Sequence, residues 1–273
     1  MAAANAYLLW KAFLLDRLLI KQPRLRRFLT RLIEGQSVQD VSLLGTRICV
    51  DSIKENGYLR ASRFANRASL FRDEAAVIVN LAALLQDGDT FVDIGANVGI
   101  YSLTLARMQR ILPRTGFYAF EANPDTFARL RPKAEALGVK AYNLALSDHC
   151  GTLEFVGGAV SHVFTTVPNI SGYSIADARV SVPCRRLDEM EIEGDSIVLK
   201  IDVEGQEREV LEGAKGLFAA SRIKAVYLDG YKEKEVESFL KGHGLTLLDG
   251  TTLQPTQGNL FGLLAVRNPR ADG

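Results

Sequence analysis

The chain has 273 residues, of which 47% are hydrophobic and 24% charged, and its formal net charge is +1. This composition supports a core of ordinary size and argues against a general nucleic-acid-binding protein, which normally carries a strong basic excess. The three cysteines, Cys49, Cys150 and Cys184, form no Cys-x-x-Cys pair. Their pattern predicts a cytoplasmic, reducing environment without a structural zinc site.

Residues 1–35 form an N-terminal segment with its own pattern. Tyr7 to Ile20 is apolar but contains charged residues and is too short to span a bilayer, and no signal peptide is predicted. After it, apolar residues follow the spacing of an amphipathic helix with arginines on its other faces: Leu25, Phe28, Leu29, Leu32 and Ile33. Two interpretations are open. The helix packs over the main domain, which is the commoner arrangement, or residues 7–33 make peripheral contact with an anionic membrane or a partner.

Residues 36–84 are expected to pack on the core that follows. Thr46 to Asp51 and Tyr58 to Ala61 are predicted to be short strands, joined by a turn at Glu55 to Gly57. Asp73 to Leu85 has the pattern of a helix.

From residue 85 to 268 the pattern alternates between strands and helices. It predicts core strands at 90–94, 116–120, 139–144, 196–201, 223–228, 245–248 and 260–267. Helices are expected at 98–111, 123–137 (kinked or interrupted at Pro132), 206–219 and 232–241. Two further strands, 152–156 and 180–183, flank a long polar loop, 157–178. The fold class is therefore α/β, with a mostly parallel sheet wrapped by helices.

The first core strand ends in a glycine-rich turn, Gly95-Ala96-Asn97-Val98-Gly99, and leads directly into a helix. Backbone N–H groups at such a helix N-terminus suit a nucleotide-like cofactor. Asn97 stands where a dinucleotide fingerprint has its second glycine, which favours an adenosine-like cofactor without a diphosphate. Asp93, just before the turn, is suited to a cationic amino group nearby. Together these features favour S-adenosylmethionine over NAD.

An acidic residue, Glu121, ends the next core strand. A carboxylate at this place accepts hydrogen bonds from both ribose hydroxyls of an adenosine. The alternative role is a favourable charge at the N-terminus of the helix that follows. Because Glu121 occurs together with Asp93 and the two glycines, the ribose role is preferred.

Four ordered motifs resemble the FkbM family of S-adenosylmethionine-dependent methyltransferases: 92–102, 120–124, 143–148 and 199–205. The resemblance covers about residues 85–268 and implies a Rossmann-like, doubly wound seven-stranded sheet with an antiparallel last strand. It also implies O-methylation of sugars or polyketide-type natural products. By this resemblance Asp93, Gly95 and Gly99, with Asn97 in the same turn, line the methionine end. Glu121 binds the ribose, and the loop at Asp148 contacts the adenine, although Asp148 equally suits a turn cap.

The candidate catalytic residues, Lys200, Asp202 and Glu204, alternate with apolar residues and reach the carboxyl end of a core strand. A carboxylate there is able to orient or deprotonate an acceptor hydroxyl. A divalent metal between the two carboxylates is an alternative that we do not predict. In a purely structural interpretation, Asp202 and Glu204 fix the turn before Gly205, and Lys200 neutralises their charge.

The roles of two residues near this edge of the sheet are left open. His162, in the long loop, is either a base or, more commonly for such a position, a solvated side chain. Asp229 stands where the resembling family more often has a glutamate, which leaves the acceptor in doubt.

The sequence thus predicts a methyltransferase acting on a small-molecule or glycan acceptor. The alternatives are a catalytically silent adaptor with the same fold and, less favoured because of Asn97, an NAD-type oxidoreductase.

Overall fold

The computed structural model describes residues 22, 25, 28–29, 31–32, 35–64, 69–108, 114–158, 164–166, 175–258 and 261–267. Its centre is a seven-stranded sheet with the order β12-β13-β11-β10-β3-β4-β5. The strands are β3 (Thr90–Ile94), β4 (Gly116–Phe120), β5 (Lys140–Tyr142), β10 (Ile197–Ile201), β11 (Ile223–Gly230), β12 (Leu245–Asp249) and β13 (Phe261–Arg267). β13 runs antiparallel to both neighbours, whereas the other pairs are parallel. The predicted mostly parallel sheet with an antiparallel last strand is confirmed.

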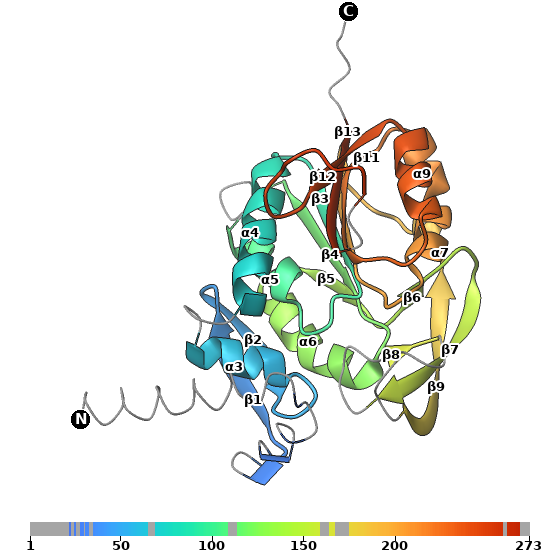
Figure 1. The fold of residues 1–273 in the computed structure, drawn as a ribbon. Helices are drawn as coiled ribbons and strands as arrows, with labels where there is room; N and C mark the ends of the chain where they lie inside the picture. The colour runs from blue at the N-terminus through green and yellow to red at the C-terminus, as the bar shows by residue number, and fades with distance from the viewer. Residues whose placement is uncertain are drawn as a thin grey trace, which may run out of the picture.

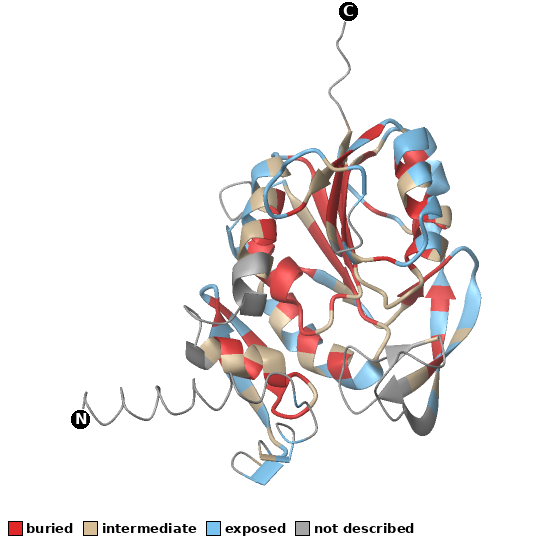
Figure 2. Ribbon diagram, in the orientation of Figure 1, coloured by how far each residue is buried: buried red, intermediate tan, exposed pale blue. Residues whose placement is uncertain are grey.

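Helices cover both faces of this sheet (Figure 1). On one face lie α4 (Ser69–Leu84), α5 (Ile100–Met108) and α6 (Pro124–Ala136), and on the other α7 (Glu207–Glu212), α8 (Lys215–Ala219) and α9 (Glu235–Gly242). Side chains alternate along each strand, so Phe91 enters the first core and Val92 the second. Buried residues accordingly concentrate in the strands and on the inner helix faces (Figure 2).

Two helix predictions need correction. α6 is one helix that contains Pro132, because Asn123 caps its start and buried Leu130 and Ala134 hold it on the sheet. The helix is therefore not interrupted at Pro132. The single helix predicted over 206–219 is two helices, α7 and α8, which separate at Gly213. The Gly213 carbonyl accepts a hydrogen bond from the Asp188 N–H, outside the helix, at 3.0 Å, and a side chain at Gly213 would overlap the carbonyl oxygen of Ser147.

The segment before the sheet is a hairpin, β1 (Val38–Leu43) and β2 (Thr46–Asp51), followed by α3 (Asn56–Phe64). The turn residues Leu44 and Gly45 both have positive φ, as a two-residue hairpin turn requires. The predicted strand at Tyr58 to Ala61 is wrong because this stretch lies within α3. The carboxylate of Asp51 accepts hydrogen bonds from the backbone N–H groups of residues 53 and 54, and this turn leads into the helix instead of a second hairpin.

Part of the N-terminal amphipathic pattern is described. Residues 25, 28, 29, 31 and 32 are helical, and the side chains of Leu25, Phe28 and Leu32 are 42%, 63% and 71% exposed. These three side chains are therefore not covered by the main domain. The apolar stretch from Tyr7 to Ile20 lies outside the described residues. Among the described residues no helix is long and apolar enough to cross a membrane.

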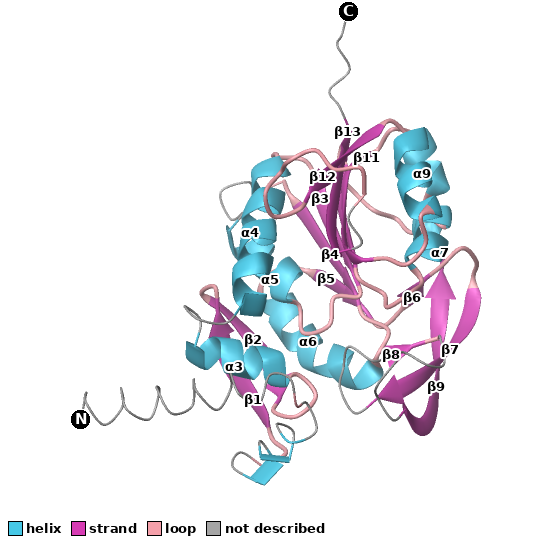
Figure 3. Cartoon of the chain, in the orientation of Figure 1, coloured by secondary structure: helices cyan, strands magenta, loops and turns pink. Residues whose placement is uncertain are grey.

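A second, four-stranded sheet is inserted between β5 and β10 (Figure 3). Its strands are β6 (Ala145–Leu146), β7 (Gly151–Gly158), β8 (Phe164–Thr165) and β9 (Ile175–Arg185), in the order β6-β9-β7-β8. The segment predicted as a long loop is therefore partly strand. Residues 159–163, which include His162, and residues 167–174 lie outside the described residues. Phe155, Val182 and Cys184 give this sheet a small core of its own.

Candidate active site

A hollow opens at the carboxyl ends of β3, β4 and β10. The position is the one where open α/β sheets bind ligands. The lining residues come from the sheet ends and from the inserted sheet: Ile94, Gly95, Asn97, Phe120, Glu121, Ala122, Leu144, Ala145, Leu146, Leu153, Phe155, Asp202, Val203, Glu204 and Gln206.

The glycines in the turn after β3 are required mainly by close contacts within the protein. Gly95 has φ +72°, and a methyl group on it would overlap the carbonyl oxygen of Asp202. Gly99 has φ +84°, and a Cβ there would lie 2.5 Å from the Leu130 side chain. Asn97 also has a positive φ, +51°, which asparagine tolerates better than most residues. Its side-chain oxygen, Oδ1, is buried and has no hydrogen-bond partner among the described residues.

Glu121 lies across this turn. Its Oε2 accepts a hydrogen bond from the Asn97 N–H at 2.7 Å, and its Oε1 accepts one from the Asn123 N–H at 2.8 Å. Burial raises the pKa of Glu121 to about 7, although these two hydrogen bonds oppose the rise. The N-terminus of α6 is capped by the Asn123 side chain. Glu121 therefore faces the hollow with one backbone bond on each oxygen and a further lone pair on each for a ligand.

The wall beyond Glu121 is apolar. Leu144, Leu146 and Phe155 face the hollow, and Phe155 comes from the inserted sheet. An apolar slot beside a carboxylate with free lone pairs has the chemistry that binding an adenosine requires. The sequence does not indicate that Leu153 and Phe155 line the hollow. The alternation of apolar residues along a strand does not show which part of the molecule the inserted sheet contacts.

Asp148 does not belong to this wall. It is exposed, and its Oδ1 lies 2.6 Å from Nδ1 of His149 and accepts a hydrogen bond from Ser147. Its proposed adenine contact stays a prediction.

Lys200 lies under the turn, with a side chain only 3% exposed. Its Nζ donates to the carbonyl oxygen of Gly95 at 2.8 Å and lies 3.2 Å from Asp93 and 3.6 Å from Asp202. Burial alone would lower the pKa of Lys200, but the negative charges of Asp93, Asp202 and Asp229 raise it above its usual value.

Asp93 is fully buried, and it also accepts a hydrogen bond from the Ser102 N–H of α5 at 3.1 Å. Asp93 and Lys200 thus connect the glycine-rich turn, α5 and β10.

Two carboxylates, those of Asp202 and Glu204, also line the hollow. Burial raises the pKa of Asp202, Lys200 opposes this effect, and Asp229 adds to it; the Asp202 side chain is 38% exposed. The pKa of Glu204 is raised to about 7 by burial and then by the charges of Asp202 and Glu207.

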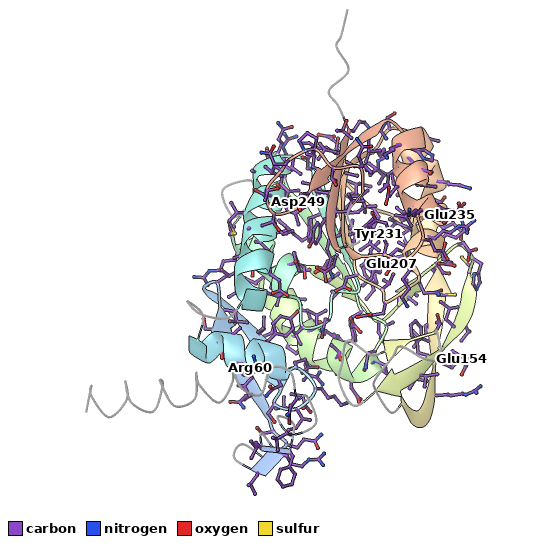
Figure 4. The ribbon with its side chains drawn as sticks, in the orientation of Figure 1. Arg60, Glu154, Glu207, Tyr231, Glu235 and Asp249 are labelled. Carbon is purple, nitrogen blue, oxygen red and sulfur yellow. The ribbon has the colours of Figure 1, made fainter. Side chains whose placement is uncertain are left out.

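Contacts within the protein stabilise the turn that carries Glu204. Glu204 has a positive φ, +52°, and the Gly205 N–H donates to Glu207, which is labelled in Figure 4. Within the described part of the chain, no cluster of three histidine, cysteine or acidic residues has the arrangement of a metal site.

Comparisons with known proteins identify related methyltransferases. Residues 93–245 match the methyltransferase FkbM domain. The chain is 28% identical over 235 residues to the hexuronic acid methyltransferase AglP of Haloferax volcanii, covering 81% of this chain and 87% of that protein. It is 27% identical over 199 residues to the 31-O-demethyl-FK506 methyltransferase FkbM of Streptomyces tacrolimicus, covering 60% and 75%.

Among solved structures, the methyltransferase FkbM from Methylobacillus flagellatus matches with 13% identity and a TM-score of 0.44. The match covers 77% of this chain, which spans about half (52%) of that protein. The family domain accounts for more than half of the present chain and contains the glycine-rich turn, Glu121 and the two carboxylates. The chain therefore belongs to the FkbM family of S-adenosylmethionine-dependent methyltransferases.

Proposed function

We propose that this protein methylates a hydroxyl oxygen of a sugar, a glycolipid or a natural product. One observation carries the proposal: the carboxylates of Asp202 and Glu204 line the same hollow as Glu121 and the glycine-rich turn. The groups that we assign to the acceptor and those that we assign to the adenosine thus share one hollow. The two relatives named above support an acceptor of this class, since one acts on a hexuronic acid and the other at an oxygen of FK506.

When bound, S-adenosylmethionine supplies an electrophilic methyl group on a positively charged sulfur. Glu121 would accept hydrogen bonds from the ribose hydroxyls, and Leu144, Leu146 and Phe155 would pack against the base. Asp93 is enclosed by Lys200 and the Ser102 N–H. We assign it a positioning role, in which it fixes Lys200 and, through it, the Gly95 carbonyl.

The acceptor hydroxyl must lose its proton as its oxygen is methylated. A general base is most effective when its pKa lies near the working pH, and Glu204, with a pKa of about 7, meets this condition. Asp202 lies beside it and is oriented by Lys200. We propose that Asp202 holds the hydroxyl, that Glu204 accepts the proton, and that Lys200 keeps Asp202 in place without touching the acceptor.

Calorimetric titration with S-adenosylhomocysteine tests the cofactor half of this proposal. Binding in the micromolar range is expected, at about −8 kcal/mol. Transfer of a radiolabelled methyl group to pooled glycan and lipid extracts tests the acceptor half. A protein that binds no S-adenosylhomocysteine would contradict the proposal. Binding without transfer to any extract would favour the silent adaptor instead.

A further inference from the structure

Two walls of the hollow begin where the neighbouring strands β4 and β5 end. Residues 121–122 follow β4, residues 144–146 follow β5, and both stretches line the hollow. The last register pair of these parallel strands is Phe120 with Tyr142. The N–H of residue 121 then donates to the Tyr142 carbonyl at 3.0 Å. The regular strand pairing therefore ends before the two walls, and the backbone groups of the walls need other partners.

Asn143 connects the two walls through its side chain. It is half-buried and lies between β5 and the wall at residues 144–146. Its Nδ2 donates to the carbonyl oxygen of Glu121 at 2.8 Å and to that of Ala122 at 3.0 Å. An amide NH₂ group has two donors, so one side chain satisfies both carbonyls. The asparagine thus extends the connection between β4 and β5 beyond the last backbone hydrogen bond.

The hydrogen bonds of Asn143 hold the backbone of Glu121, whereas other groups hold its carboxylate. The carboxylate accepts from the N–H groups of Asn97 and Asn123. A ribose hydroxyl must meet this carboxylate at about 2.5–3.0 Å and at a suitable angle. The wall that we assign to the base, at residues 144–146, directly follows Asn143. Asn143 therefore fixes the place of the ribose acceptor relative to the surface that contacts the base.

We propose that Asn143 is a positioning residue for the methyl donor, which holds Glu121 at the separation from the base-binding wall that one adenosine requires. The inference rests on the proposed function, because it takes Glu121 as the ribose acceptor. Asn143 is not among the residues that line the hollow, so its effect passes through Glu121. The competing interpretation is a purely structural role, in which Asn143 stabilises the end of β5 and has no influence on ribose recognition.

Asn80 on α4 is a matched control for Asn143. It is also half-buried, and its Nδ2 also donates to two consecutive backbone carbonyls, those of Gly250 at 2.8 Å and Thr251 at 3.1 Å. The structure describes all three of these residues, and none of them lines the hollow. Asn143→Ala and Asn80→Ala therefore remove the same kind of bond pair, one beside the hollow and one away from it.

The test compares two ligands on the full-length protein by calorimetric titration: S-adenosylhomocysteine and its analogue without the two ribose hydroxyls. The wild type and Asn80→Ala should prefer S-adenosylhomocysteine about 100-fold or more, because two hydrogen bonds to a charged carboxylate are at stake. Asn143→Ala should weaken S-adenosylhomocysteine binding about ten-fold or more and change the affinity for the analogue less than about three-fold. Asn143→Ser, which keeps one donor on a shorter side chain, should give an intermediate preference.

The ligand preference is a ratio of two affinities measured on the same variant. Partial unfolding weakens both apparent affinities by the same factor, so it does not change the ratio. A purely structural role of Asn143 would therefore lower stability and leave the ribose preference at its wild-type value.

The outcomes separate the two levels of the proposal. A wild-type protein that binds no S-adenosylhomocysteine would contradict the proposed function, and equal binding of the two ligands would remove Glu121 from the ribose site; either result also ends the present inference. If the wild type prefers the ribose and Asn143→Ala keeps that preference within about three-fold, the inference fails and the proposed function stands. The inference also fails if Asn80→Ala loses the preference as strongly as Asn143→Ala.

Discussion

The hydrogen bonds of Glu121 make a quantitative test of the cofactor site possible. Glu121→Gln keeps the size of the side chain but replaces one acceptor oxygen with an NH₂ group. Each oxygen of Glu121 currently accepts a backbone N–H, from Asn97 at 2.7 Å or from Asn123 at 2.8 Å. In the variant one of these N–H groups would face another donor, and one ribose hydroxyl would lose its charged acceptor.

The magnitude follows from the strength of such bonds. A hydrogen bond to a charged group contributes about 1.5–3 kcal/mol, and each 1.4 kcal/mol changes an affinity about ten-fold. Loss of one ribose bond with partial misalignment of the other should weaken S-adenosylhomocysteine binding about 100-fold. Isothermal titration calorimetry measures this directly. Glu135→Gln is the control, because Glu135 makes an exposed ion pair with Arg131 on α6 and should leave binding unchanged.

The pH dependence of binding tests the same assignment, because its direction follows from the pKa of Glu121. The pKa of Glu121 is about 7 in the folded protein and 4.5 in its ordinary state. The folded state therefore holds the proton more tightly, so the ionisation of Glu121 lowers the stability of the free protein as pH rises from about 4.5 to 7. Ribose hydroxyls donate to the ionised carboxylate, so the wild-type affinity for S-adenosylhomocysteine should rise through pH 7 and level off above it. A Glu121→Gln protein that binds within three-fold of the wild type, or a wild-type affinity that falls between pH 6 and 8, would refute the assignment.

Three further changes probe the rest of the chain. Asp202→Asn should leave S-adenosylhomocysteine affinity within about three-fold but lower methyl transfer at least 100-fold, roughly 2.7 kcal/mol in barrier; normal turnover would remove Asp202 from the site. Transfer should also rise with pH through about 7 as Glu204 ionises, and Glu204→Gln should flatten that profile.

Gly95→Ala should destabilise the protein in urea by more than Gly138→Ala, which has positive φ but open space around it and should cost about 1–2 kcal/mol. Equal losses of stability in the two variants would show that the close approach to the Asp202 carbonyl does not contribute to the destabilisation. Finally, serine at the exposed apolar positions of residues 25–32 should reduce sedimentation with phosphatidylserine vesicles but not with phosphatidylcholine vesicles. Unchanged sedimentation would argue against membrane contact.

The sheet could be predicted well because its signals are local. β4 runs from Gly116 to Phe120 as its apolar residues predict, and β3 ends at the glycine-rich turn. α3 could not be predicted, since Tyr58 to Ala61 has strand-like composition and only the turn at Asp51 directs the chain into a helix. The inserted sheet was partly missed because its polar stretch owes its strands to pairing between β7 and β9, which is not a local property.

The candidate site shows the same division. Alternation places Lys200 and Asp202 on one face of β10, but it does not indicate how deeply each side chain is buried. Lys200 is buried and bonded to the Gly95 carbonyl, whereas the Asp202 side chain is 38% exposed. That difference arises from strand register, which sets Asp93 beside Lys200 and places the turn above both.

The buried position of Lys200 has a consequence for specificity. Its one positive charge is shared by Asp93 and Asp202 and supports the turn of the cofactor site, so it is not available to attract an anionic acceptor. Strand register places Tyr227 beside Lys200 on β11, and the Tyr227 hydroxyl donates to Asp229, a further carboxylate. A positively charged methyl donor is attracted by these carboxylates.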